Sequence, residues 1–321
     1  MRTTAGRRGA GTRGGVSPAT LGAVAVVAVV ALLSACGSPG AGPATGPAPA
    51  STSVAPGPGG PASATTPAAP ATAPVGPTGA DGTSGGWQLV WGDEFDGPAG
   101  AGPDRTRWGF DTGAGGWGNG ELETYTDSTA NARLTGTGAL EIVARREGEG
   151  FTSARLSTEK TFTRRYGTYE ARLRLPAGKG LWPAFWLNGV CAQGWPDCGE
   201  IDVLESVDPV PRTVRGRVHV PGPHARPGLG RDWPVASALD EGFHVYGVVW
   251  DPEYVAFTFD GHEYARVRKD RLPAGDRWAL DHDAYVLLNV AVGGRWPGSP
   301  DASTPVPSRL TVDWVRVWDR A

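Results

Sequence analysis

Residues 166–176 read YGTYEARLRLP, and their side chains alternate between apolar and charged. Ala171, Leu173 and Leu175 are separated by charged residues at 170, 172 and 174. Successive side chains of a strand point to opposite faces, so this period of two predicts an antiparallel strand with one buried face.

Similar short segments recur along the chain, at residues 87–91, 139–144, 244–250, 284–292 and 310–318. Residues 255–267 contain Asp260-Gly261 between two such runs, which is a strong signal for a hairpin turn. No long run has the helical period of 3.6 residues. The pattern predicts an all-β fold: a β-sandwich jelly roll of two stacked antiparallel sheets with a concave cleft.

The folded part begins at Trp87. Residues 1–86 contain no aromatic residue, and all 13 Trp lie from Trp87 onward. A core therefore forms only in residues 87–321, a length typical of one β-sandwich domain.

Residues 1–36 have the features of an export signal. Four Arg precede the uncharged run LGAVAVVAVVALL at residues 21–33, which is too short for a comfortable membrane span. The run leads into LSAC, which resembles the bacterial lipoprotein signal, with Cys36 as the lipidated first residue of the mature protein. An ordinary cleaved signal with an incidental Cys is the alternative. We expect an extracytoplasmic protein that is lipid-anchored to a bacterial cell membrane, or released from it.

Residues 37–86 consist almost entirely of Pro, Ala, Gly, Thr and Ser, with Asp81 as the one charge. This composition predicts a disordered linker. The chain has a net charge of −3, and residues 1–86 carry four Arg and one Asp, so residues 87–321 carry −6. We therefore expect no nucleic-acid partner.

Residues 199–206, GEIDVLES, place three acids in an otherwise apolar run. In a regular strand Glu200 and Asp202 share one face, and Glu205 lies on the other. A β-bulge between Asp202 and Glu205 would bring all three acids to one face. An exposed strand with salt bridges is the alternative interpretation.

Two carboxylates on one face are the equipment of a glycosidase that retains anomeric configuration, because such enzymes need a nucleophile and an acid/base about 5–5.5 Å apart. Sugar rings also need flat apolar surfaces. Six tryptophans in Gly/Pro-rich or strand-end contexts are candidates to line the cleft: Trp117, Trp182, Trp186, Trp195, Trp233 and Trp296. Five others are expected in the core: Trp87, Trp91, Trp250, Trp314 and Trp318.

Several other motifs are less informative. Cys191 and Cys198 could form a small-loop disulfide or remain as buried thiols. Residues 113–118 satisfy GxGxxG, but no apolar helix follows, so we exclude a dinucleotide site. The five His show no metal-ligand spacing.

Residues 87–318 resemble glycoside hydrolase family 16, and within it the bacterial endo-β-1,3-glucanases, or laminarinases. The resemblance is carried by WQLVWGDEFDG, GGWGNGELETYT, FTSARL, YGTYEARLRLPAGKGLWPAFWLNG, WPDCGEIDVLE, LLNVAVGGRWPGSPD and VDWVRVW. The bulged spacing ExDxxE is typical of one branch of this family, whereas lichenases carry ExDxE.

The resemblance implies a role for each matching residue. Glu200 would be the nucleophile, Glu205 the acid/base, and Asp202 a partner that helps to set the protonation of Glu200. The positions that match sugar-contacting residues of the family are Trp117, Asn119, Arg155, Trp182, Trp186 and His219. Catalysis needs no cofactor, and a structural Ca²⁺ is implied at Glu94, the backbone carbonyl near Gly138, and Asp313.

The expected function is a retaining endo-hydrolase of laminarin-like β-1,3-glucan. The protein is expected to be a monomer whose partner is the polysaccharide and whose one membrane contact is the lipid anchor. Alternatives are a β-glucan transglycosylase, a non-catalytic β-glucan-binding module, or a hydrolase of mixed-linkage glucan or galactan. The segment PGPHARPGLGRDW departs from the family pattern and leaves the linkage preference open.

Overall fold

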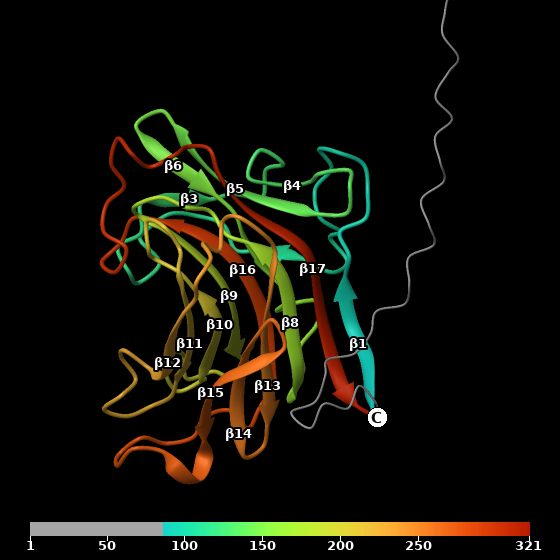
Figure 1. Cartoon of the computed structure of the whole chain (residues 1–321), viewed down its shortest axis with the longest axis vertical. Helices are drawn as coiled ribbons and strands as arrows, with labels where there is room; N and C mark the ends of the chain where they lie inside the picture. The colour runs from blue at the N-terminus through green and yellow to red at the C-terminus, as the bar shows by residue number, and fades with distance from the viewer. Residues whose placement is uncertain (1–85) are drawn as a thin grey trace, which may run out of the picture. The chain divides into compact units, whose positions relative to one another are not determined.

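The computed structural model describes residues 86–321, which form two stacked β-sheets (Figure 1). The predicted export signal, the lipidation site Cys36 and nearly all of the linker lie outside the described residues. Within residues 86–321, no helix is long and apolar enough to cross a membrane.

The ten-stranded sheet has the order β15-β14-β13-β8-β17-β5-β6-β3, with β1 paired to β17 and β4 paired to β5. Its elements are β1 (Trp87–Asp93), β3 (Glu123–Tyr125), β4 (Ala132–Leu134), β5 (Leu140–Glu147), β6 (Gly150–Ser153), β8 (Gly167–Arg174), β13 (His244–Asp251), β14 (Tyr254–Phe259), β15 (His262–Arg268) and β17 (Ser308–Arg320). One short 3₁₀ helix, η1 (Lys269–Arg271), follows β15.

The seven-stranded sheet has the order β12-β11-β10-β9-β16-β7-β2. Its strands are β2 (Gly109–Phe110), β7 (Arg155–Ser157), β9 (Leu181–Gly189), β10 (Glu200–Glu205), β11 (Thr213–His219), β12 (Leu229–Pro234) and β16 (Ala284–Val292). In Figure 1, β9 to β12 lie in the layer at the left, and β8, β17 and β1 lie in the layer at the right.

The all-β prediction is confirmed, and each strand predicted from alternation is present. Asp260 and Gly261 adopt the positive φ angles of 46° and 78° that a tight hairpin turn requires. The antiparallel prediction misses one pair, because β3 and β6 run parallel.

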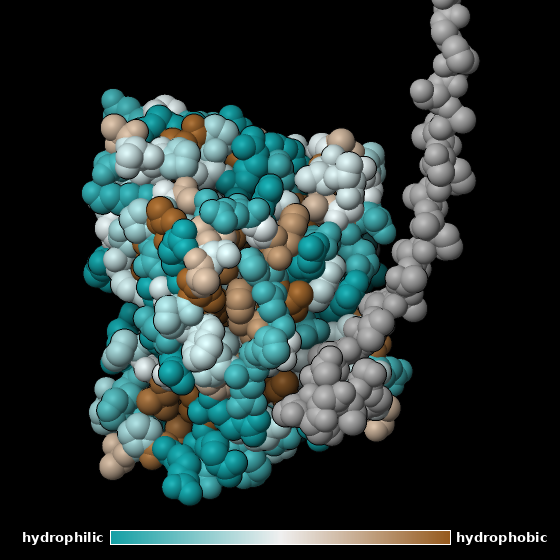
Figure 2. Space-filling model, viewed as in Figure 1, coloured by the Kyte–Doolittle hydropathy of each residue, from teal (hydrophilic) through white to brown (hydrophobic). Residues whose placement is uncertain are grey.

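The core lies between the sheets, where the inward-facing side chains of both interdigitate. Leu173 of β8 and Leu187 of β9 are fully buried within it, and Trp250 is 2% exposed. The outer face of the molecule seen in Figure 2 is mainly hydrophilic, with apolar residues in separated patches. This segregation is what the alternating pattern predicts.

Two of the five tryptophans predicted for the core are not in it. Trp91 packs against the core and Trp318 is buried, but Trp87 and Trp314 are only half-buried. Trp87 lies on β1, a short strand paired only to β17. A register shift between Val312 and Trp314 in β17 breaks the alternation there, and the Arg316 guanidinium lies 4.1 Å from the Trp314 ring.

Candidate active site

The three acids lie on β10, and a β-bulge brings them to one face. The pairing of β10 with β11 shifts register between Asp202 and Glu205, as predicted. Val203 and Leu204 both point into the core, so Glu205 returns to the face of Glu200 and Asp202. We call this surface of the seven-stranded sheet the acidic face.

Gly199 fixes the start of the acidic strand. It has φ +67°, and a Cβ placed there would come within 2.4 Å of the backbone oxygen of Ala279. Any larger residue would push Glu200 out of position, which explains a glycine immediately before the first acid.

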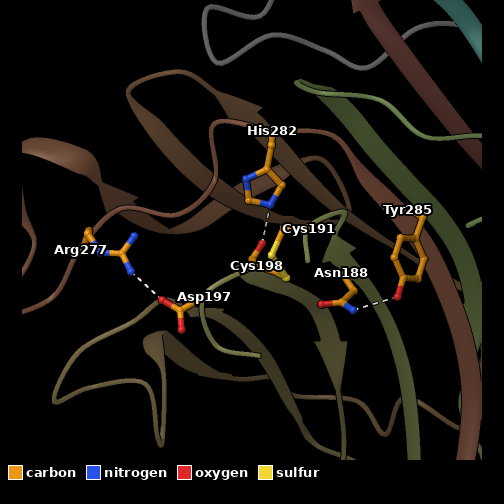
Figure 3. Close-up of a disulfide and its surroundings, with 7 residues drawn as sticks. All are labelled: Asn188, Cys191, Asp197, Cys198, Arg277, His282 and Tyr285. Carbon is orange, nitrogen blue, oxygen red and sulfur yellow. Dashed lines mark hydrogen bonds and ion pairs between the residues drawn. A yellow bond between two sulfur atoms is a disulfide. The ribbon is translucent and has the colours of Figure 1, made fainter. Parts of the chain in front are cut away.

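The loop before Gly199 is closed by a disulfide between Cys191 and Cys198, which settles the alternative that the sequence left open (Figure 3). Arg277 donates to Asp197 at 2.6 Å, and His282 Nε2 lies 2.7 Å from the carbonyl oxygen of Cys198. The loop is thus tied to the segment that leads into β16.

The disulfide loop also brings Trp195 to the acidic face. Its ring centroid lies 5.9 Å from that of His219, and the Arg226 guanidinium lies 4.4 Å from the Trp195 ring. Trp195 is 40% exposed, so part of the indole is accessible to a ligand.

Each acid has a distinct environment. Glu205 is 8% exposed and accepts a hydrogen bond from Trp182 Nε1 at 3.0 Å. His219 Nε2 lies 3.0 Å from Asp202 Oδ2 and 3.8 Å from Glu200 Oε1. The Asp202 contact is an ion pair and not a well-directed hydrogen bond.

Burial and mutual repulsion favour protons on the outer two acids. Burial, and then the charge of Asp202, raise the pKa of Glu200 to about 8. The same two causes raise the pKa of Glu205 well above its usual range. The positive charge of His219 opposes both shifts.

His219 supplies the compensating positive charge. Burial opposes its protonation, but the adjacent carboxylates of Asp202 and Glu200 outweigh burial and raise the pKa of His219 to about 10. Its Nδ1 also lies 2.6 Å from the carbonyl oxygen of Ala225, which can only accept. An imidazolium at this position stabilises an ionised Glu200.

Aromatic side chains extend the site on both sides of the acids. The Arg155 guanidinium lies 5.0 Å from the Trp117 ring and 4.7 Å from the Trp186 ring, and Asp111 holds it by an ion pair at 2.9 Å. Beside Glu205, Trp182 contacts Trp296 edge-on at 5.3 Å. The arrangement offers flat apolar surfaces that can stack on sugar rings.

The structure thus brings most of the predicted residues together, but Trp233 is an exception. Asp232 pairs with Arg215 in the register of β11 and β12, so its neighbour Trp233 points to the opposite side of the sheet. There the Trp233 ring lies 6.1 Å from Tyr264 of the other sheet. Trp233 therefore closes the edge of the sandwich and does not line the acidic face.

Residues that the sequence reasoning missed support the site from behind. Asn289 accepts a hydrogen bond from Trp186 Nε1 at 2.8 Å, and Asp111 orients Arg155. Asn289 is the single polar residue in the apolar run LLNVAV, and this contrast could have marked it as a candidate site residue.

The predicted calcium ligands are bonded to arginines. Both oxygens of Glu94 accept from Arg316 at 2.8 Å, and Asp313 accepts from Arg172 at 2.6 Å. Among residues 86–321, the one group of three His or acidic side chains close enough to share a metal ion is Glu200, Asp202 and His219, in the acid site itself. The calcium site stays a prediction.

A two-sheet sandwich with paired carboxylates and flanking indoles on one face defines a protein that acts on polysaccharides. The model of glycosyl hydrolases family 16 matches residues 117–316, and the chain belongs to this family. It is a glycoside hydrolase, and the family prediction from the sequence is confirmed.

Similar proteins are known from several organisms. A beta-glucanase of Rhodothermus marinus is 39% identical over 72% of this chain and 85% of its own length. A glucan endo-1,3-beta-glucosidase of Cryptopygus antarcticus is 36% identical over 73% of this chain and 93% of its own length. The solved catalytic domain of an endo-1,3-beta-glucanase from Thermotoga petrophila is 40% identical, with a TM-score of 0.66 over 73% of this chain and 98% of that one.

Proposed function

We propose that this protein is a retaining endo-β-1,3-glucanase that cleaves laminarin-like glucan. The observation that carries the proposal is the bulged strand β10, which places Glu200 and Glu205 on one face with Asp202 between them. The relatives named above as endo-1,3-beta-glucanases support the substrate class.

In the proposed reaction, the ionised Glu200 attacks the anomeric carbon while Glu205 protonates the departing glycosidic oxygen. Glu205 is suited to the acid role because burial and the charge of Asp202 favour its protonated form. In the second step, Glu205 takes a proton from water, and that water releases the glucan from Glu200. Trp182 holds the Glu205 carboxyl in place through both steps.

The proposal is tested by comparing reducing-end release from laminarin, barley mixed-linkage glucan and a β-1,4-galactan by residues 87–321. We expect laminarin to be cleaved fastest, with the β-anomer released first in proton NMR spectra. Faster cleavage of another polymer would contradict laminarin-like glucan as the substrate. First release of the α-anomer would contradict the retaining mechanism. Products longer than the starting oligosaccharide would reveal transglycosylation, whose first step is identical.

A non-catalytic glucan-binding module is the second candidate function. Three carboxylates crowded on one face, two of them with raised pKa values, are costly to maintain without a catalytic use. Binding of laminarin without any cleavage by a well-folded protein would favour that candidate.

The predicted structural calcium is a further part of the proposal. Binding at Glu94 and Asp313 would require the ion to replace Arg316 and Arg172 as their partners. We expect calcium to raise the melting temperature, EDTA to reverse the increase, and Asp313→Asn to remove the response. If neither calcium nor EDTA changes the melting temperature, the proposed calcium site is rejected.

We also propose that Cys36 carries a lipid anchor and that residues 37–86 tether the enzyme to the membrane from outside the cell. The LSAC motif and the linker composition support this. Cys36→Ser should release the protein from the membrane fraction of the expressing bacterium, and unchanged membrane association would contradict the anchor.

A further inference from the structure

A chain of hydrogen bonds behind the acidic face ends on one carboxylate, Glu121. Trp186 Nε1 donates to Asn289 Oδ1 at 2.8 Å, and Asn289 Nδ2 donates to the Tyr125 hydroxyl at 3.1 Å. That hydroxyl donates to Glu121 Oε2 at 3.2 Å. From the other side, Asn119 Nδ2 donates to Glu121 Oε1 at 2.9 Å.

Both ends of this chain are residues that face the proposed glucan. Trp186 stacks on Arg155, and Asn119 lies in the same loop as Trp117. The Trp117 ring also meets Tyr125 edge-on, with centroids 5.3 Å apart. The network therefore contacts both indoles that flank Arg155.

The direction of the bonds requires an acceptor at Glu121. Tyr125 and Asn289 are only 1% and 7% exposed, so water cannot replace a missing partner inside the network. Glu121 accepts one hydrogen bond on each oxygen, and an ionised carboxylate does this without offering a donor of its own. A glutamine at position 121 would place its NH₂ group against one of the two donors, Asn119 Nδ2 or the Tyr125 hydroxyl.

A second carboxyl group, Glu123, adjoins Glu121 and is almost completely buried. It is 1% exposed, and its Oε2 accepts the backbone N–H of Val292 at 2.6 Å. Within the described residues, its Oε1 has no hydrogen-bond donor. Burial, and then the neighbouring Glu121, raise the pKa of Glu123 to about 8.

Among the described residues, the groups that shift the pKa of Glu123 are neutral or negative. Glu121 precedes it in the chain, Tyr125 lies on β3 with it, and β16 contributes the backbone N–H of Val292. Arg155 of β7 acts on Tyr125, and Arg295, which follows β16, donates to the carbonyl oxygen of Gly118 at 2.8 Å in the loop that leads to Glu121. A protonated Glu123 avoids the repulsion that two neighbouring carboxylates would exert on each other.

We propose that Glu121 is a positioning residue that orients Asn119 and, through Tyr125 and Asn289, Trp186 for glucan binding, and that Glu123 supports it as a neutral carboxylic acid. This inference rests on the proposed function of the acidic face. It adds a residue that touches neither the reacting atoms nor the sugar.

The test measures the affinity for a laminari-oligosaccharide by calorimetry in the Glu205→Gln background, which prevents turnover. Adding Glu121→Gln should weaken binding roughly tenfold at pH 6.5, because two donors lose a charged acceptor. Adding Glu123→Gln should leave affinity at pH 6.5 unchanged, because an amide stands in for a neutral acid. The matched control is Glu149→Gln, at an exposed turn residue, which should have no effect.

The pH dependence separates positioning from simple structural support. The parent should bind more weakly at pH 9 than at pH 6.5 as Glu123 ionises, and Glu123→Gln should reduce this difference. If Glu121→Gln does not fold, Tyr125→Phe breaks the chain at its middle and should weaken binding in the same direction. The proposal would be overturned if Glu121→Gln and Tyr125→Phe both bound the oligosaccharide as tightly as the parent. It would also be overturned if Glu121→Gln and Glu123→Gln lost affinity equally.

Near-ultraviolet circular dichroism of the free protein gives a readout that needs no glucan. Glu121→Gln should alter the tryptophan signal, and Glu123→Gln should preserve it. Failure of the wild type to cleave or bind laminarin would reject the proposed substrate, while the dichroism comparison would still decide whether Glu121 orients Trp186.

Discussion

Replacing Glu200 or Glu205 with glutamine should lower kcat on laminarin on the order of 10⁴-fold, because each change removes one of the two groups that make and break bonds. Glutamine keeps the size of the side chain, so the fold and glucan binding should persist. Initial rates, the melting temperature and the affinity for a laminari-oligosaccharide would be measured on each variant. Near-wild-type turnover in either variant would refute its assigned role.

The two acids can also be told apart. In Glu200→Gly, azide can occupy the space of the missing nucleophile and should restore cleavage with formation of an α-glycosyl azide. In Glu205→Ala, azide should attack the glycosyl-enzyme from the opposite face and give the β-glycosyl azide. The opposite pattern would exchange the two assignments.

Glu170→Gln is a matched control for these substitutions. Glu170 lies on β8 of the other sheet, where burial raises its pKa to about 7 and Trp318 Nε1 donates to it at 3.1 Å. It is thus also a half-buried carboxyl with an indole partner. Its replacement should affect stability and leave kcat close to that of the wild type.

Asp202→Asn should lower kcat/KM roughly 10²- to 10³-fold and move the pH optimum toward lower pH. The charge of Asp202 raises the pKa of both Glu200 and Glu205, so its removal lowers both values. Glu200 must be ionised and Glu205 protonated, and therefore both limbs of the pH profile should shift to the acid side. The measurement is kcat/KM between pH 4 and 10.

His219 should respond to the same substitution. The Asp202 carboxylate 3.0 Å away is the main group that raises the pKa of His219, so Asp202→Asn should lower that pKa as followed by NMR. An unshifted pH profile together with an unchanged His219 titration would show that Asp202 does not control protonation at the site.

Much of the fold could be predicted because the buried and exposed side chains of a strand alternate along the sequence as apolar and polar residues. The alternation of residues 166–176 predicted β8, and Asp260-Gly261 predicted the β14–β15 turn. Where both faces of a strand are buried, or where a bulge interrupts the strand, the alternation of apolar and polar residues does not predict which side chains are buried. Trp314 was assigned to the core because a bulge in β17 cannot be seen from composition.

Part of the candidate site could also be predicted from the sequence, because the spacing of the three acids differs from that of a regular strand. The bulge in β10 is predictable because the spacing of the three acids is one residue out of phase with a regular strand, and one extra residue brings Glu205 to the face of Glu200 and Asp202. The prediction that Trp233 lines the cleft is wrong because the face of this residue depends on the register of β12 against β11, which joins segments apart in the chain.

By itself, the sequence determined the strand pattern, the acid-bearing strand with its bulge, and the family to which the chain belongs. The strand pattern and the bulge follow from local spacing, since period and phase are properties of neighbouring residues, and the family follows from the resemblance of several motifs along the chain. Only the tertiary structure decided that His219 stands against Asp202, that Arg155 lies between two indoles, and that Asn289 and Glu121 form one network. Most of those contacts join residues from different strands and loops, and the position of each side chain is fixed by sheet register and packing, which no local pattern records.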